Sequence, residues 1–251
     1  MTRVLGDRYD VGEPLRRTGF GQVRVGTRRA DDAPVAVELL DEALATDPAV
    51  RTRCDTGEAV LCAVSGRHLV RVQALVVEAD GIGVVRDRVG GSDLCALRAE
   101  AGGTLAPREA VSLVVDVLDA LSDLHAAGLV HGALRERDVL VDLDVPLRPV
   151  TRLTGYGTAA LVRGRAVPTE DVLAAGRLLC VLLSGVETLP DGLPRPLQQA
   201  IEPLLLDDPC GRPTAAQARD ALADLPGLRG LAPLPPADAP TGLAALLAAE
   251  G

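Results

Sequence analysis

The amino-acid sequence predicts an α+β protein in which a small β-rich lobe precedes a larger helical lobe. Three observations support this prediction. The first third of the chain consists of short segments rich in β-branched residues, which glycine, proline and aspartate separate. From about Gly91 the apolar residues recur at helical spacing instead. No internal repeat is present, so strands and helices that follow each other in blocks indicate two segregated lobes.

The front of the chain is expected to begin with three strands, over 9–15, 21–29 and 34–40. A helix is expected next, because apolar residues recur at helical spacing over 47–66. Asp47 stands before Pro48 as a natural N-cap for that helix. Two further strands are expected on either side of the turn sequence EADG at 78–81.

The longest predicted helix covers 106–128 and ends at Gly128, which is a favourable residue after a helix C-terminus. One face of this helix carries Ala110, Leu113, Val114, Val117, Leu118, Leu121 and Leu124. Further helices are expected over 169–185, 194–209 and 214–225. A proline- and alanine-rich tail follows, with a short apolar segment at 241–250 that could bind a groove on a partner.

Composition excludes several classes of function. The formal charge of −9 argues against nucleic acid or an anionic membrane as the main partner. Five cysteines without a CxxC pair indicate reduced thiols rather than a disulfide framework or a zinc site. No signal peptide and no long apolar run is visible, so we expect a cytoplasmic protein without membrane insertion.

Six segments, in order, resemble the bacterial-type serine/threonine protein kinase domain. They are RYDVGEPLRRTGFGQVRVG, VAVELL, LHAAGLVHGALRERDVLV, TRLTGYGTA, EDVLAAGRLLCVLLSG and DDPCGRPTAAQARDAL. The resemblance implies a protein kinase-like fold with a β-rich N-lobe over 5–89 and a helical C-lobe over 90–225. The Pro/Ala-rich tail would then cover 226–251, and the lobes would join near 89–91.

The resemblance also shows where this sequence departs from the kinase pattern in its nucleotide-binding half. The glycine loop GxGxxG falls on Arg16, Thr18 and Gly21, so one of three glycines is kept. In VAVELL, Ala36 keeps its place and Glu38 stands at the position of the phosphate-binding lysine. A carboxylate there would repel phosphates. The chain contains no lysine that could substitute.

The catalytic-loop segment departs from the kinase pattern in the same way. The motif HRDLKxxN falls on 131–138, where Ala133 replaces the aspartate that handles the hydroxyl proton. His131 is kept, and we expect a structural role for it. Arg135 takes the place of a lysine, and Asp138 takes the place of the magnesium-binding asparagine and could still ligate a metal.

The third departure is in the stretch that resembles DFG. Gly155 takes the place of its aspartate, and the activation segment that should follow is much shortened. Asp171 matches the aspartate that braces the catalytic loop from beneath. Arg212 matches an arginine whose usual glutamate partner is missing, which leaves it exposed, paired elsewhere or in contact with another chain.

These departures lead to the expectation of a pseudokinase that is not an enzyme, with Glu38, Ala133 and Gly155 as its degenerate positions. It would use no cofactor, with ATP and magnesium bound weakly or not at all, and would hold no metal. Its partner would be another signalling protein, and it could form homo-oligomers. The alternative is an atypical ATP-dependent phosphotransferase that uses Arg135 and the carboxylates of Asp138, Asp142 and Asp144.

One further expectation concerns the vacant pocket. In GVVRDRVGG the kinase pattern puts Arg86 at the gatekeeper position, near the strand that carries Glu38. We expect the two side chains to form an internal ion pair, because neither charge is tolerable there alone. The alternative is a register one residue away, which would place Val85 inside and send Arg86 to solvent.

Overall fold

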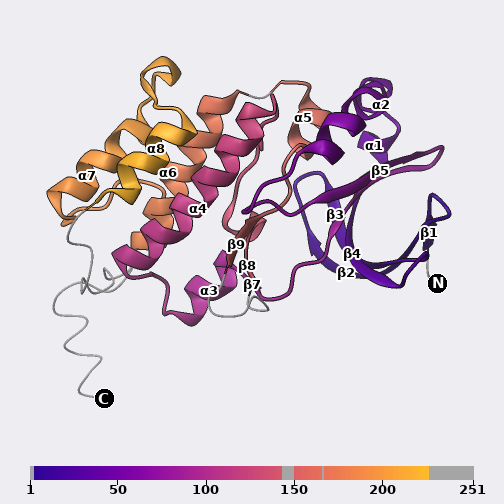
Figure 1. Ribbon diagram of the computed structural model, residues 1–251, viewed down its shortest axis with the longest axis horizontal. Helices are drawn as coiled ribbons and strands as arrows, with labels where there is room; N and C mark the ends of the chain where they lie inside the picture. The colour runs from indigo at the N-terminus through magenta and orange to yellow at the C-terminus, as the bar shows by residue number, and fades with distance from the viewer. Residues whose placement is uncertain (1–2, 143–149, 166, 226–251) are drawn as a thin grey trace.

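A computed structural model describes residues 3–142, 150–165 and 167–225, and their arrangement confirms the predicted α+β class. A β-rich lobe and a helical lobe lie side by side (Figure 1). The β-rich lobe contains one antiparallel sheet of six strands in the order β1-β2-β3-β4-β6-β5. Its strands are β1 (Arg3–Leu5), β2 (Tyr9–Arg17), β3 (Gly21–Arg28), β4 (Ala33–Leu40), β5 (Val72–Glu78) and β6 (Gly81–Asp87).

The two faces of this sheet differ in what they cover. Side chains alternate between faces along a strand. Val35 and Val37 of β4 therefore point into a small apolar cluster inside the β-rich lobe, together with Val85 of β6. The opposite face of the same strands carries Ala36 and Glu38 and turns toward the helical lobe. The register pairs Ala36 with Arg86 and Glu38 with Val84, which brings these side chains to one face.

Two helices separate β4 from β5. They are α1 (Glu42–Ala45) and α2 (Pro48–Ala63). Asp47 caps α2 as predicted, because its carboxylate accepts the backbone N–H groups of Ala49 at 2.7 Å and Val50 at 3.4 Å. α2 ends at Ala63, three residues before the predicted limit at Gly66.

The helical lobe is built around α4 (Pro107–Ala126), which packs against α6 (Pro168–Ser184) and α8 (Ala215–Ala223). Its buried face includes the predicted Ala110, Val114, Val117, Leu118, Leu121 and Leu124. Gly128 follows the helix with a φ of 73°, a conformation that suits glycine. The remaining elements are α3 (Leu94–Glu100), α7 (Arg195–Ile201), η2 (Glu202–Leu205) and η3 (Pro209–Gly211).

Short elements between the lobes position the site. A second sheet of three strands has the order β7-β8-β9 and lies between α4 and the six-stranded sheet (Figure 1). These elements are β7 (Ser92–Asp93), η1 (Glu136–Asp138), β8 (Val139–Asp142), β9 (Val150–Leu153) and α5 (Thr158–Arg163). In the part of the chain that is described, no helix combines the length and apolar composition needed to cross a membrane. The tail over 226–251 lies outside the described residues.

Replacing Asp47 with alanine removes the N-cap of α2 and leaves two backbone N–H groups without their acceptor. We expect Asp47→Ala to lower the free energy of unfolding by about 1 kcal/mol. Urea denaturation followed by circular dichroism measures the loss. Asp55→Ala, an exposed aspartate within the same helix, is the control and should change stability by less than about 0.5 kcal/mol. Equal losses in the two variants would contradict the capping role.

Candidate functional site

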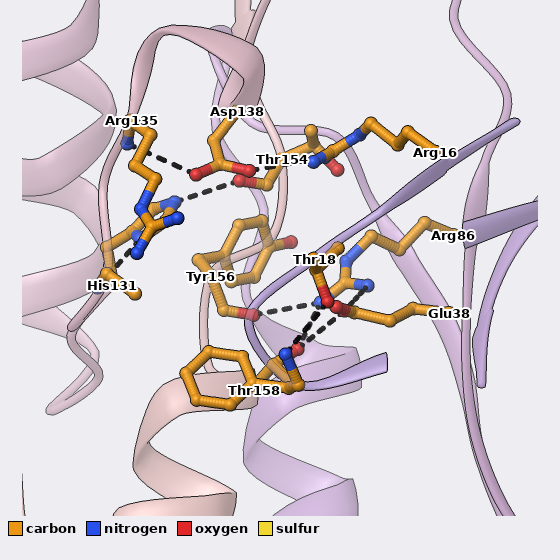
Figure 2. A network of polar contacts seen from close by, with 12 residues as sticks. Arg16, Thr18, Glu38, Arg86, His131, Arg135, Asp138, Thr154, Tyr156 and Thr158 are labelled. Carbon is orange, nitrogen blue, oxygen red and sulfur yellow. Dashed lines mark hydrogen bonds and ion pairs between the residues drawn. The ribbon is translucent and has the colours of Figure 1, made fainter. Parts of the chain in front are cut away.

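The central feature of the site is a buried ion pair between β4 and β6. Arg86 Nη1 donates to Glu38 Oε2 at 3.0 Å, and each residue is only 3% exposed (Figure 2). The expected internal pair is therefore present. The alternative register is excluded, because Val85 lies in the apolar cluster on the other face of the sheet.

Residues that follow β9 complete the coordination of this pair. The hydroxyl of Thr158 donates to Glu38 Oε2 at 2.9 Å and accepts from Arg86 Nη2 at 3.0 Å. Arg86 Nη2 also donates to the carbonyl oxygen of Tyr156 at 3.1 Å. The pair thus ties the six-stranded sheet to the start of α5.

Tyr156 anchors the same segment on its other side. Its ring is fully buried, and its hydroxyl donates to the carbonyl oxygen of Val70 at 2.8 Å. Burial raises the pKa of Tyr156 to about 12, because the ionised phenolate would be poorly solvated. Gly157 follows with a φ of 81° and serves as the N-cap of α5, where its missing side chain lets Leu61 of α2 approach closely.

Asp138 is the carboxylate that faces the space between the lobes. Its Oδ1 atom lies 3.2 Å from Arg16 Nη2, which reaches across from β2, and its Oδ2 atom accepts the backbone N–H of Arg135 at 3.1 Å. Gly155 lies directly against it. A Cβ atom at Gly155 would stand 3.1 Å from Asp138 Oδ1, and the φ of 80° disfavours any side chain there.

The side chain of Thr18 closes the loop between β2 and β3 with hydrogen bonds to the backbone. The hydroxyl of Thr18 accepts the backbone N–H groups of Phe20 at 3.1 Å and Gly21 at 3.0 Å. Gly21 has backbone atoms of Leu39 so close that no Cβ atom would fit. At Gly19 a Cβ atom would meet nothing within 4 Å, so the loop leaves open space at this point.

Asp171 braces the loop that carries Ala133. Its carboxylate accepts the backbone N–H groups of His131 at 2.8 Å and Gly132 at 2.7 Å, and lies 3.0 Å from His125 Nε2. His131 is 1% exposed, and its Nε2 atom lies 2.9 Å from the carbonyl oxygen of Thr154. The loop is therefore held from α6 on one side and from the end of β9 on the other.

Arg212 finds its partners inside the described chain. Its guanidinium bonds Glu170 Oε1 at 3.0 Å and the carbonyl oxygens of Thr169 at 3.0 Å, Leu206 at 2.8 Å and Asp207 at 3.2 Å. Glu170 is thus the carboxylate that the sequence left unassigned. It was missed because it stands directly beside Asp171, which had already been assigned to the brace.

The contact between α2 and α5 was also not predicted. Gly57 of α2 faces Leu161 of α5, and Arg53 donates to the carbonyl oxygens of Leu161 at 2.6 Å and Val162 at 2.7 Å. Glu58, the next residue of α2, accepts the backbone N–H of Leu75 at 3.4 Å and takes no part in the buried pair. An arginine among polar helix residues gave no signal for this contact, because its partners lie 108 and 109 residues away.

Two adjacent cavities occupy the cleft between the lobes. The first has a volume of about 330 Å³ and is lined by Leu15, Val23, Ala36 and Leu140, by Asp87, Arg88, Val89 and Gly91 where the lobes join, and by charged side chains that include Arg86. The second has a volume of about 210 Å³, and its wall carries five arginines. These are Arg16, Arg17, Arg135, Arg137 and Arg163. Arg16, Glu38, Arg137 and Gly155 line both cavities, so the two lie next to each other.

The donors available to a divalent cation in this cleft are few. Among the described residues no three His, Cys, Asp or Glu side chains come together as a metal cluster. Asp138 offers one carboxylate, and the side chains of Asp142 and Asp144 lie outside what the structure describes. Magnesium is often held by one or two carboxylates together with substrate phosphates, so Asp138 is a compatible ligand.

Comparison with known proteins identifies relatives for most of the chain. A sequence profile described as protein tyrosine and serine/threonine kinase matches residues 9–165. Serine/threonine-protein kinase PkaB of Streptomyces coelicolor is 32% identical, over 93% of this chain and 67% of that protein. PkaA of the same organism is 30% identical, over 85% of this chain and 49% of that protein. The crystal structure of the Mycobacterium tuberculosis PknI kinase domain matches with a TM-score of 0.73 at 20% identity, over 88% and 97% of the two chains, which shows the fold.

Two expectations drawn from the sequence are wrong. The chain was expected not to be an enzyme, and to bind ATP and magnesium weakly or not at all. Relatives similar over most of its length are instead named kinases, a class that uses ATP with magnesium, and nothing in the comparisons shows a loss. The physical reason lies in Glu38. Its carboxylate is buried and neutralised by Arg86, so it presents no free charge that would repel phosphates.

Removing one member of the buried pair leaves the other charged and without its partner. We expect Glu38→Ala to lower the free energy of unfolding by about 3–5 kcal/mol, and Glu38→Met with Arg86→Met together to cost less than the two single changes added. Urea denaturation measures each variant. Asp41→Ala breaks the exposed pair with Arg17, as a control, and should cost no more than about 1 kcal/mol. Additive losses for Glu38 and Arg86 would contradict the coupling.

The phenol of Tyr156 makes stability depend on alkaline pH. Its pKa is raised to about 12 in the folded protein, against about 10 in the unfolded chain. The folded state thus holds this proton more tightly, so the contribution is complete below about pH 10 and is lost as pH rises toward 12. Tyr156→Phe should flatten the fall in stability between about pH 10 and 12, measured by urea titrations at each pH. An unchanged slope would show that the phenol is not the group responsible.

Proposed function

Because the chain belongs to the protein tyrosine and serine/threonine kinase family, we propose that it is an ATP-dependent phosphotransferase with an atypical site. The proposal rests on one observation. A cavity beside the segment joining the lobes lies next to a second cavity whose wall carries five arginines. The first suits a flat apolar base and the second suits a chain of phosphates.

The base half of the cleft supports this proposal through its lining. Val23 and Ala36 come from adjacent strands of the upper sheet, and Leu140 comes from β8 below. An aromatic base between these apolar side chains would bury both of its faces. The backbone of 87–91 lies along the edge of the same cavity and offers hydrogen-bonding groups to the base edge.

The phosphate half supports it through charge. Arg16, Arg137 and Arg163 approach the cavity from β2, η1 and α5 respectively. Each guanidinium can bond two phosphate oxygens in its plane and stays charged at any physiological pH. Arginine therefore supplies the positive charge that lysine supplies in the kinase pattern.

The pair between Arg16 and Asp138 gives the phosphates a defined way to enter. Both side chains are partly accessible, at 19% and 13% exposed, so each can leave the other and bind a ligand. Phosphates would take Arg16 from Asp138 and leave that carboxylate free. Magnesium, when bound, would neutralise charge on the phosphates, and Asp138 is the residue that would hold it.

Transfer of the phosphoryl group requires no covalent bond between the protein and the phosphate. The acceptor hydroxyl oxygen forms a bond to the terminal phosphorus of ATP, and the bond from that phosphorus to the bridging oxygen of ADP breaks. Ala133 offers no base, so the hydroxyl proton passes to an oxygen of the transferred phosphoryl group. Because a positioned base contributes about 10²–10⁴ in rate, we propose a slow enzyme.

The test measures transfer of the terminal phosphate from radiolabelled ATP with magnesium, both to the protein itself and to a serine- and threonine-containing peptide mixture. We expect slow labelling that Asp138→Ala reduces on the order of 10²-fold, because one preorganised electrostatic contact is lost. Asp191→Ala, which changes an exposed aspartate in the helical lobe, is the matched control and should label like the parent.

Labelling that is equal in the parent, in Asp138→Ala and in a mock purification would overturn the proposed activity. Displacement of a fluorescent ATP analogue by ATP, with and without magnesium, separates binding from chemistry. ATP should compete in the parent. Failure to compete at millimolar concentration would show that the cleft does not bind nucleotide.

A further inference from the structure

A third and larger cavity lies below the phosphate half of the cleft. This groove has a volume of about 550 Å³ and is bounded by the loop over 132–136 and by the face of α6 that carries Glu170, Ala174 and Arg177. It lies beside the C-terminal end of α5, where Arg163 contributes to its wall.

Most acidic side chains of the groove have a partner within the protein. Glu136 pairs with Arg98 at 2.7 Å, and Glu170 pairs with Arg212 at 3.0 Å. Asp171 accepts two backbone N–H groups and contacts His125. Two of the carboxylates stay exposed to solvent, Glu187 at the rim at 69% and Glu170 at 55%.

The arginines of the groove are not neutralised in this way. Arg177 is 52% exposed and has only a long contact of 3.9 Å with Glu187. Arg163 donates to the carbonyl oxygen of Gly132 at 3.3 Å and stacks on the ring of Phe20, and no carboxylate of the described residues pairs with it. The Arg135 guanidinium likewise pairs with no carboxylate within the described ranges. Arg135 and Arg163 therefore bring positive charge to the groove that no carboxylate of the described residues pairs with, although the chain as a whole carries −9.

The groove also opens into the site of the proposed transfer. Ala133, Arg135 and Arg163 line both the groove and the arginine-rich cavity above it. A polypeptide lying along α6 could thus place one hydroxyl beside Ala133, next to the terminal phosphate. Its flanking residues would then lie against Arg163 and Arg177.

We infer that this groove binds an extended, acidic segment of a protein substrate, with carboxylates of the segment paired to Arg163 and Arg177. That the hydroxyl of the segment is phosphorylated rests on the proposed function. That the segment binds rests on the charges of the groove alone. Carboxylate and guanidinium form paired hydrogen bonds in one plane, which gives both attraction and orientation. Basic segments would meet like charge and be excluded.

The test measures binding without nucleotide, so that it does not depend on catalysis. Three fluorescent peptides share one serine-containing sequence and differ in their flanks, which are glutamate, glutamine or arginine. Fluorescence anisotropy at low salt should give the tightest binding for the glutamate peptide, with at least a fivefold preference over glutamine. Raising the salt to 0.5 M should remove most of this preference.

Arg177→Glu is the informative variant, because Arg177 lies on the groove wall and outside the nucleotide cleft. It should weaken the glutamate peptide at least tenfold and leave the glutamine peptide unchanged. Arg195→Glu makes the same charge change at an exposed position that lines none of these cavities and should have less than a twofold effect. Circular dichroism melts confirm that both variants fold, and Arg177→Gln, with a smaller loss in the same direction, replaces Arg177→Glu if that protein is unstable.

The outcomes separate this inference from the proposed activity. Preferred binding of the glutamate peptide without phosphate transfer would support the groove and overturn the enzyme. Transfer to glutamine and glutamate peptides alike, with equal affinities, would support the enzyme and overturn the groove. Equal effects of Arg177→Glu and Arg195→Glu would also overturn the proposed binding groove, since the net charge of the protein would then explain the preference for the glutamate peptide.

Discussion

The buried pair of Glu38 and Arg86 is the interaction on which the arrangement of the cleft depends. Both charges lie on the face of the sheet that meets the helical lobe, where an unpaired charge would be costly. The hydroxyl of Thr158 and the carbonyl oxygen of Tyr156 supply the further hydrogen bonds of the pair and lie against the sheet for this reason. The pair therefore fixes not only β4 against β6 but also where the chain runs after β9.

The helix α5 forms because of these tertiary partners. Six residues are too few to form a stable helix alone. Thr158 ties its first turn to the buried pair, and Arg53 caps its last carbonyl groups from α2. Gly57 lets α2 approach Leu161. The segment that follows Gly155 is consequently held between two elements of the β-rich lobe, and the groove along α6 lies open beside it.

The sequence allowed much of the fold to be predicted, because its long elements carry local signals. The apolar face of α4 and the Asp47 cap are visible within one or two turns of sequence. The strands 21–28 and 33–40 are visible in the same way. The ion pair was predicted from the kinase pattern, which puts Arg86 at the gatekeeper position near the strand of Glu38, and the register of β4 with β6 confirms it. Three features could not be predicted: the strand β7, the helix α5, and the pairing of Arg212 with Glu170. Short elements and long-range polar contacts depend on neighbours that are distant in sequence. The effect of Glu38 on phosphates was misjudged for the same reason, because its neutralising partners are 48 and 120 residues away.

The absence of lysine explains why the cleft takes this form. A guanidinium offers five donors in one plane, so Arg86 can bond a carboxylate, a hydroxyl and a carbonyl oxygen at once. Its length lets it reach Glu38 from the neighbouring strand, and the cation of the pair thus comes from β6 while the anion comes from β4. Positive charge for a bound phosphate must then come from other arginines. Those that line the cleft approach it from β2, η1 and α5, outside the buried pair. The buried pair and the five arginines of the second cavity are therefore different residues, and a substitution in one group can be made without neutralising the other.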